Sequence, residues 1–491
     1  MAPKRRSFIR RNPALSFSLA AFALIGAWLA YEVTRAITAT PGRPGQYAST
    51  VESLIADLQK GLPGPDAWAE VVRVVNLAKS SQRAVYDRVG RTANPGQFPL
   101  APEDWTETDF WPPDPNTVGT SQATPRTEAI VREIIAQARA DGVMDGLDAL
   151  TPPRRAVRPI PEARFIDILV PELGAARGVA RLNHARMVFA VGDGDMNEFV
   201  SAFEHTLALA RIIGSQSTLI DRLVGYAMAG LAMTDLRNVI SDGRLDAETL
   251  RLALAVIDRN LPLPSIESAL ECERYFMLDT IEWTHTTSGR AIPSAMHALS
   301  GDGSSAAGVA ASNLGRLANL AAVVMPSREE SISVANALYD RMVEEARLPA
   351  HARSKPSPAD QYVEGVSPRY VVVKTLAPAF SRSFEVASMH VTDVAGTRAL
   401  IALELYRSDH GRYPGSLGDL VPGYLDAPPE DQFNPAGLTY TLRDPTAPVS
   451  RAFLLYSLGS DMADNQGAFT AKGSPFVAGE DMVYNLRRPE P

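Results

Sequence analysis

The sequence predicts a mainly α-helical protein with one membrane-spanning helix near its N-terminus and a small α+β domain at its C-terminus. An uncharged run of 20 residues occupies positions 12–31, and apolar residues recur at helical spacing through most of 47–385. After Thr397, a helical pattern is followed by turn residues and two short runs with strand character. We therefore divide the chain into an anchoring segment at 1–46, a helical domain at 47–385 and an α+β domain at 386–491.

The composition bounds the class of function. The chain has 491 residues, of which 45% are hydrophobic and 21% charged, as in ordinary globular proteins. The formal charge is −8, and five basic residues among the first 11 leave −13 for the rest, which offers no basic surface for nucleic acid. The single cysteine, Cys272, excludes an intramolecular disulfide and a multi-cysteine metal site, and we expect it in the helical core.

The run at 12–31 has the length and flanks of a membrane anchor. As a helix it would measure about 30 Å, which matches the hydrocarbon thickness of a bilayer. The five basic residues before it place the N-terminus in the cytoplasm by the positive-inside rule. We therefore expect a single-pass protein of the cytoplasmic (inner) membrane whose body, after Glu32, lies outside the cytoplasm. Residues 40–46, rich in proline and glycine, have the composition of a stalk.

Two features leave the processing of the N-terminus open. Arg5 and Arg6 resemble the twin-arginine export motif, but basic segments also produce such pairs by chance. Residues 34–36 are a poor cleavage site and no lipobox cysteine is present, which favours an uncleaved signal-anchor over a removed signal peptide.

The helical domain begins with two helices and a long loop. Residues 47–78 give two amphipathic patterns, interrupted by the glycine- and proline-rich segment 61–65. The segment 91–126 is rich in proline and aromatic residues. We expect a loop whose rings pack on helices, with contact to a ligand as the alternative.

From 128 to 258 the pattern is helical almost throughout. Two helical runs, at 180–191 and 197–212, flank a turn at 192–195, and small residues alternate with large ones along both runs. These residues are Ala185, Ala190, Ala202 and Ala208 among Leu182, Phe189, Phe203 and Leu207. The alternation resembles a tetratricopeptide-like helical hairpin. Because the pattern does not recur at a fixed period, we expect an irregular α-helical bundle or solenoid.

Candidate catalytic groups are few. One helical segment carries four acids: Glu271, Glu273, Asp279 and Glu282. A solvated face is their expected role, with acid–base catalysis as the alternative. The seven histidines include no pair at metal-ligand spacing. Glu204 and His205 are neighbours on a predicted helix, where adjacent side chains point about 100° apart, so we do not expect them to work as a pair. We therefore predict that the protein is not an enzyme.

The C-terminal region contains a helix, a turn, a short helix and two strands. The first helix ends near Gly411, which can take the left-handed cap conformation. Ser416 is placed to cap a short helix, with Asp419 three residues later as its partner. Two strand candidates follow, at 438–442 and 452–458.

This order resembles the globular domain of the major pseudopilin of type II secretion systems. The matching residues are Gly411-Arg412-Tyr413-Pro414, Asp431 to Pro435 and Tyr456-Ser457-Leu458-Gly459-Ser460-Asp461. The resemblance covers about a fifth of the chain and implies a fold, not an activity. In a pseudopilin the globular domain follows directly on the membrane helix, whereas here over 350 residues intervene.

The resemblance also implies a calcium site in the acidic turn after the second strand. Calcium takes about six to eight oxygen ligands from carboxylates, amides and carbonyls. Carried over to this chain, the ligands would be the carbonyl oxygen of Leu458 and the side chains of Asp461, Asp464, Asn465 and Asp481. Met462 stands where the family has a glycine, and residues 468–478 lengthen the loop. An exposed hairpin turn without metal therefore stays the alternative.

Three classes of function remain. The leading prediction is a membrane-anchored, extracytoplasmic interaction or scaffold protein that binds protein partners and catalyses no reaction. The first alternative is a component of a type II secretion or pilus-like machine, and the second is an extracytoplasmic hydrolase. Calcium is the cofactor that the resemblance implies, and no nucleic-acid partner is expected.

Overall fold

The structure is a computed structural model. It describes residues 41–88, 125–160, 164–167, 170–292, 295–296, 299, 325–377, 381–443, 452–468 and 480–485. Within these ranges, no helix combines the length and the apolar content that a membrane crossing requires. The predicted span at 12–31, the arginine pair before it and most of the predicted loop at 91–126 lie outside the described residues.

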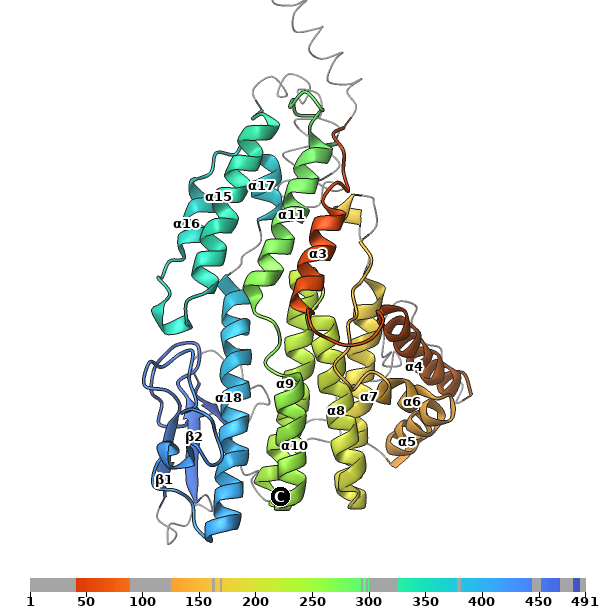
Figure 1. Cartoon of the computed structure of the whole chain (residues 1–491), viewed down its shortest axis with the longest axis vertical. Helices are drawn as coiled ribbons and strands as arrows, with labels where there is room; N and C mark the ends of the chain where they lie inside the picture. Colours follow the sequence, from red (N-terminus) through yellow and green to blue (C-terminus); the bar gives the residue numbers. More distant parts are fainter. Residues whose placement is uncertain are drawn as a thin grey trace, which may run out of the picture.

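The described part is mainly helical and carries one small antiparallel sheet, as the sequence predicted (Figure 1). The α-helices are α3 (Ala48–Leu58), α4 (Trp68–Arg88), α5 (Pro125–Ala140), α6 (Val143–Asp148), α7 (Pro171–Asp193), α8 (Met196–Gly214), α9 (Leu219–Ser241), α10 (Ala247–Asn260), α11 (Ile266–Thr284), α15 (Arg328–Ala346), α16 (Pro358–Gly365), α17 (Val371–Leu376) and α18 (Ser381–His410). The 3₁₀ helices are η2 (Phe165–Asp167), η3 (Ala350–Ala352) and η4 (Leu417–Leu420), and the strands are β1 (Thr439–Leu442), β2 (Phe453–Ser457) and β3 (Met482–Val483).

The predicted helical hairpin is formed by α7 and α8. Gly194 follows α7 in the left-handed conformation, with a φ of 76°. The Asp195 side chain then caps α8 by accepting a 3.0 Å hydrogen bond from the amide of Glu198. α9 packs on both helices and begins with a capping box between Thr218 and Asp221. Local turn chemistry thus fixes the chain reversals in this layer.

The helices are arranged around one extended core. α7, α8 and α9 lie side by side, α4 packs on α7 together with α5 and α6, and α11 leads to α15, α16 and α17 (Figure 1). One hydrophobic cluster includes Val71 of α4, Phe203 of α8 and Leu403 of α18. Cys272 is buried on α11, as predicted.

α18 connects this helical body to the sheet, because it contacts α9 and α10 as well as β2 and η4. The helix ends as predicted, with Gly411 at a φ of 70°. The amide of Ser416 donates a 2.9 Å hydrogen bond to Asp419, as expected for their capping partnership. The division expected between residues 385 and 386 falls inside α18.

The sheet has the order β1-β2-β3, and both pairs are antiparallel. Thr439 pairs with Tyr456 between β1 and β2, and Tyr456 pairs with Val483 between β2 and β3. The two predicted strands form, each within one residue of its expected ends. β3 was not predicted, because two residues are too short for an alternating pattern to be read.

The prediction of a stalk at 40–46 is wrong for its described residues, 41–46. The amide of Gly42 donates a 3.1 Å hydrogen bond to the carbonyl of Glu282, and the amide of Gly45 donates to the Asp279 carboxylate. A Cβ on Gly42 would lie 2.6 Å from the Glu282 carbonyl oxygen, so this close approach requires glycine. The segment is therefore bound to α11.

The acids of α11 do not form one solvated face. Glu271 does pair with Arg274, at 3.2 Å, as expected, and the Glu271 side chain is partly exposed. Asp279 and Glu282, in contrast, are 0% and 7% exposed. They are buried because the segment 41–46 folds back over the C-terminal half of α11, which composition alone could not reveal.

Candidate functional site

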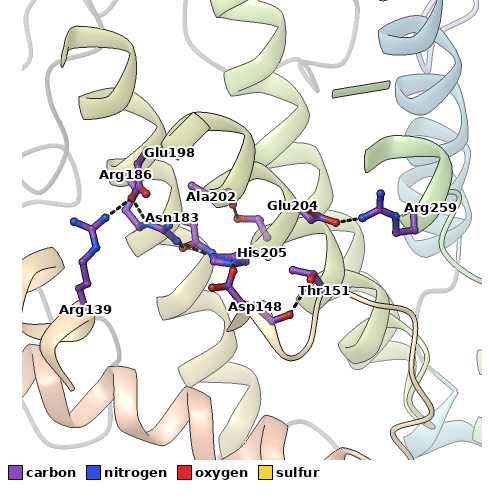
Figure 2. Close-up of polar contacts among 11 residues, drawn as sticks. Arg139, Asp148, Thr151, Asn183, Arg186, Glu198, Ala202, Glu204, His205 and Arg259 are labelled. Carbon is purple, nitrogen blue, oxygen red and sulfur yellow. Dashed lines mark hydrogen bonds and ion pairs between the residues drawn. The ribbon is translucent and has the colours of Figure 1, made fainter. Parts of the chain in front are cut away.

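A cluster of polar groups joins α6, α7 and α8 (Figure 2). His205 of α8 is 2% exposed. Its Nε2 lies 2.7 Å from Oδ1 of Asp148, the last residue of α6. Its Nδ1 lies 2.9 Å from Nη1 of Arg186 on α7. Three helices thus each contribute one side chain to a continuous line of hydrogen bonds.

The partners of His205 fix its tautomer. A guanidinium can only donate hydrogen bonds, so Nδ1 of His205 must accept from Arg186. The ring proton is therefore on Nε2, which donates to Asp148. Burial, together with the Arg186 charge, lowers the pKa of His205, and Asp148 opposes the shift. A neutral imidazole held in this way would have to lose its bond to Arg186 in order to take up a proton.

The network continues from Arg186 to the surface. The guanidinium donates from Nε to Glu198 at 2.7 Å and from Nη1 to Asn183 at 2.8 Å. Glu198 also accepts a 2.9 Å hydrogen bond from Arg139 of α5. Asp148 at one end and Arg139 at the other are largely exposed, with side chains 64% and 56% accessible. The buried part of the network therefore ends in a solvent-exposed carboxylate on one side and a solvent-exposed guanidinium on the other.

Glu204 takes no part in this network, although it precedes His205 in the chain. Its carboxylate pairs with Arg259 of α10, on another side of α8 (Figure 2). The prediction that the two neighbours do not face each other is confirmed. No local pattern in the sequence indicates Asp148 and Arg186 as partners of His205, and Asp148 is 57 residues away from it.

The predicted calcium ligands lie around the turn that follows β2. Asp464 accepts hydrogen bonds from the Tyr456 hydroxyl at 2.9 Å and from the amide of Gln466 at 2.8 Å. Asp481 accepts from the amides of Asn465 at 3.4 Å and Gly467 at 2.6 Å. The structure thus brings Asp481 back to the turn, as the resemblance implies.

The remaining two ligand candidates flank that site. Asp461 accepts a 3.1 Å hydrogen bond from the amide of Ala463, and the amide of Leu458 donates to Asp431. Burial raises the pKa of Asp481, and the nearby charges of Asp464 and Asp461 raise it further. The three carboxylates therefore share one electrostatic environment.

The carboxylate oxygens of this turn are ligands that calcium accepts. Their arrangement, however, is that of a turn whose own backbone amides donate hydrogen bonds to those carboxylates. Each of Asp461, Asp464 and Asp481 already accepts at least one backbone hydrogen bond. Among the described residues, no group of three or more histidine, cysteine or acidic side chains has the arrangement of a metal site. Calcium at this turn stays a prediction, as does the alternative of a plain surface turn.

A scan of the chain against protein-family models finds no match, and neither do searches of curated proteins and of solved structures. The resemblances to pseudopilins and to tetratricopeptide-like hairpins therefore rest on the residues quoted above.

Proposed function

We propose that the chain is a membrane-anchored scaffold that presents its helical body and its small sheet to protein partners outside the cytoplasm, without catalysing a reaction. The anchor is the uncharged run at 12–31, and the acidic body, with its formal charge of −13, favours partners with basic surfaces.

The observation that carries this proposal is the attachment of the first described residues to α11. Asp279 accepts hydrogen bonds from the amides of Gly45 and Phe165, the latter at 3.0 Å, so one buried carboxylate holds two distant segments. We call this set of three residues the Asp279 clamp. Only nine residues, 32–40, separate the predicted span from Pro41, and they reach about 32 Å at most. The body would therefore stand close to the bilayer in a restricted orientation, which suits a scaffold.

The polar network at His205 supports the absence of catalysis. Its buried members bond to one another, and the His205 proton is committed to Asp148. A general base must instead be free to accept a proton from a substrate within hydrogen-bond reach. We therefore assign Arg186, His205 and Asp148 to joining α6, α7 and α8.

The proposal is tested by co-purification of the full chain from solubilised membranes. The native chain is expected to retain a reproducible set of partner proteins unrelated to secretion. Asp279→Ala should lose those partners while staying in the membrane, because the clamp positions the body but not the anchor. Asp426→Ala, which changes an exposed acid, is the matched control and should retain them. Recovery of no partner, together with hydrolytic turnover by the purified chain, would favour the hydrolase instead.

A component of a secretion machine is the second candidate. One observation favours it: α18, the turn at Gly411, η4, β1 and β2 follow one another in the order that the pseudopilin resemblance implies. The same co-purification distinguishes the two, since secretion-machine proteins would then be the partners recovered.

A further inference from the structure

Arg222 of α9 differs from the other deeply buried arginines of the body. Arg158 pairs with Asp221 at 2.7 Å, and Arg237 pairs with Asp393 at 2.7 Å. Arg222 is 0% exposed and donates to neutral groups: the carbonyl of Ser265, the hydroxyl of Ser268 at 3.1 Å and the hydroxyl of Tyr226. Its Nε has no hydrogen-bond partner among the described residues. A buried charge is stabilised by an opposite charge in direct contact. The nearby Asp221 carboxylate acts on Arg222 only through its charge, because it pairs with Arg158.

The position of Arg222, next to the first turn of α11, adds to the excess of positive charge. Ser265 is the N-cap of α11, and its side chain makes no capping hydrogen bond. The first turn of a helix carries a partial positive charge and amide groups that lack partners within the helix. Arg222 therefore brings a full positive charge to a helix end that itself attracts anions.

α18 contributes a third group, His390. His390 is 5% exposed, and its ring stacks on Tyr226 with 4.4 Å between centroids. Neither ring nitrogen has a partner among the described residues. Burial lowers the pKa of His390 to about 3, and the Arg222 charge acts in the same direction. The neutral ring carries one N–H donor, and the Tyr226 hydroxyl beside it already donates to Pro264 at 3.1 Å.

We propose that Arg222, His390 and the first turn of α11 bind a small inorganic anion of halide size. The guanidinium Nε, the imidazole N–H and the amides of the turn are all donors, and an anion would satisfy them and balance the charge at once. The near-complete burial of both side chains selects a single-atom ion over a phosphate, a carboxylate or a nucleotide. Arg222 lies on α9, Ser265 caps α11 and His390 lies on α18, so the ion would join three helices of the body.

The first test compares melting of the full detergent-purified chain in sodium chloride, sodium bromide and sodium gluconate at equal ionic strength. Chloride and bromide are expected to raise the melting temperature little below their dissociation constants and logarithmically with concentration above them, and gluconate to leave it unchanged. His390→Phe keeps the ring stack on Tyr226 and removes the N–H, so it should weaken the halide response at least fivefold in apparent affinity. His410→Phe, the same change at an exposed position of α18, is the control. Equal responses to all three salts would overturn the proposal.

A second test does not depend on any variant folding. Crystals grown in bromide should show an anomalous peak within hydrogen-bond distance of Arg222 Nε. A water molecule there, without anomalous signal, would overturn the proposal. Arg222→Met, if it folds, should abolish both the peak and the halide response.

Discussion

Arg237 on α9 donates a 2.7 Å hydrogen bond to Asp393 on α18, and both side chains are buried. The same guanidinium donates to Thr397 at 2.8 Å and lies 5.7 Å from the centre of the Tyr484 ring. Tyr484 follows β3 directly. One ion pair therefore connects the helical body, α18 and the last described strand.

Asp393→Asn should strongly destabilise the protein. Burial raises the pKa of Asp393, and the Arg237 charge opposes that rise. Removing the carboxylate leaves Arg237 as an unpaired buried charge, which costs about 3–5 kcal/mol of unfolding free energy. Chemical denaturation of the purified chain measures the loss.

The double variant Arg237→Met with Asp393→Leu provides the control for this prediction. Replacing both charges by apolar groups should recover most of the loss, because no buried charge is left unpaired. Arg382→Ala breaks an exposed pair with Glu385 on the same helix and should cost at most about 1 kcal/mol. If Asp393→Asn is as stable as the native chain, the Arg237–Asp393 pair is not a buried ion pair.

Gly396→Ala tests the contact between α18 and Tyr484. A Cβ at residue 396 would lie 2.2 Å from the Tyr484 ring, so the ring must move away from α18. Overpacking of this kind costs about 1–3 kcal/mol. Gly230→Ala on α9 has nothing within 4 Å of the added Cβ, and it should stabilise the helix by about 0.5–1 kcal/mol. Thermal melts of the two variants should therefore shift in opposite directions, and equal shifts would contradict the packing.

The sequence predicted the features whose interacting residues lie close together in the chain, and it did not predict contacts between distant residues. Gly411, the Ser416 and Asp419 pair, and both predicted strands were found because their signals are local. The Asp279 clamp was missed because Gly45 and Asp279 are 234 residues apart. A carboxylate on a helix shows the same pattern in sequence whether water or a distant backbone amide covers it.

The contacts of His205 were subject to the same limit, because its partners come from other helices. The geometry of one helix was enough to predict that Glu204 and His205 point apart. It could not show that Asp148 and Arg186 arrive from two other helices to fix the His205 tautomer, because that requires the packing of α6 and α7 on α8.

Glu273 makes stability depend on pH. Burial raises the pKa of its carboxyl group to about 6, from an ordinary value near 4.5, although the amide of Leu219 donates to it. Because the folded pKa is the higher one, ionisation favours the unfolded chain. Stability is therefore lost as the pH rises from about 4.5 through 6, by about 2 kcal/mol.

Glu273→Gln removes this dependence, because the amide oxygen still accepts from Leu219 and carries no charge. The variant should melt higher than the native chain at pH 7.5 and at the same temperature near pH 4. Glu271→Gln, at the surface of the same helix, is the control and should show no such difference. A constant offset at both pH values would mean that ionisation of Glu273 is not the cause.

Calcium binding at the acidic turn predicts a metal-dependent melt of the full chain. If the ion binds only the folded state, a hundredfold excess over the dissociation constant adds about 2.7 kcal/mol. Millimolar calcium should raise the midpoint of the native chain relative to chelator, and Asp461→Ala should abolish the difference. Asp426→Ala, an exposed acid outside the turn, should keep it. Identical native midpoints with and without calcium would leave a plain surface turn.

We propose that one N-terminal anchor holds the body outside the cytoplasm. A reporter enzyme that is active only outside the cytoplasm, fused after Pro491, tests it most directly. We expect an active reporter in the native fusion, because five positive charges before the predicted span favour a cytoplasmic N-terminus. Replacing those five residues by glutamine should lower the active fraction. An inactive reporter in a native fusion that is produced at full length would show that the body is not held outside the cytoplasm.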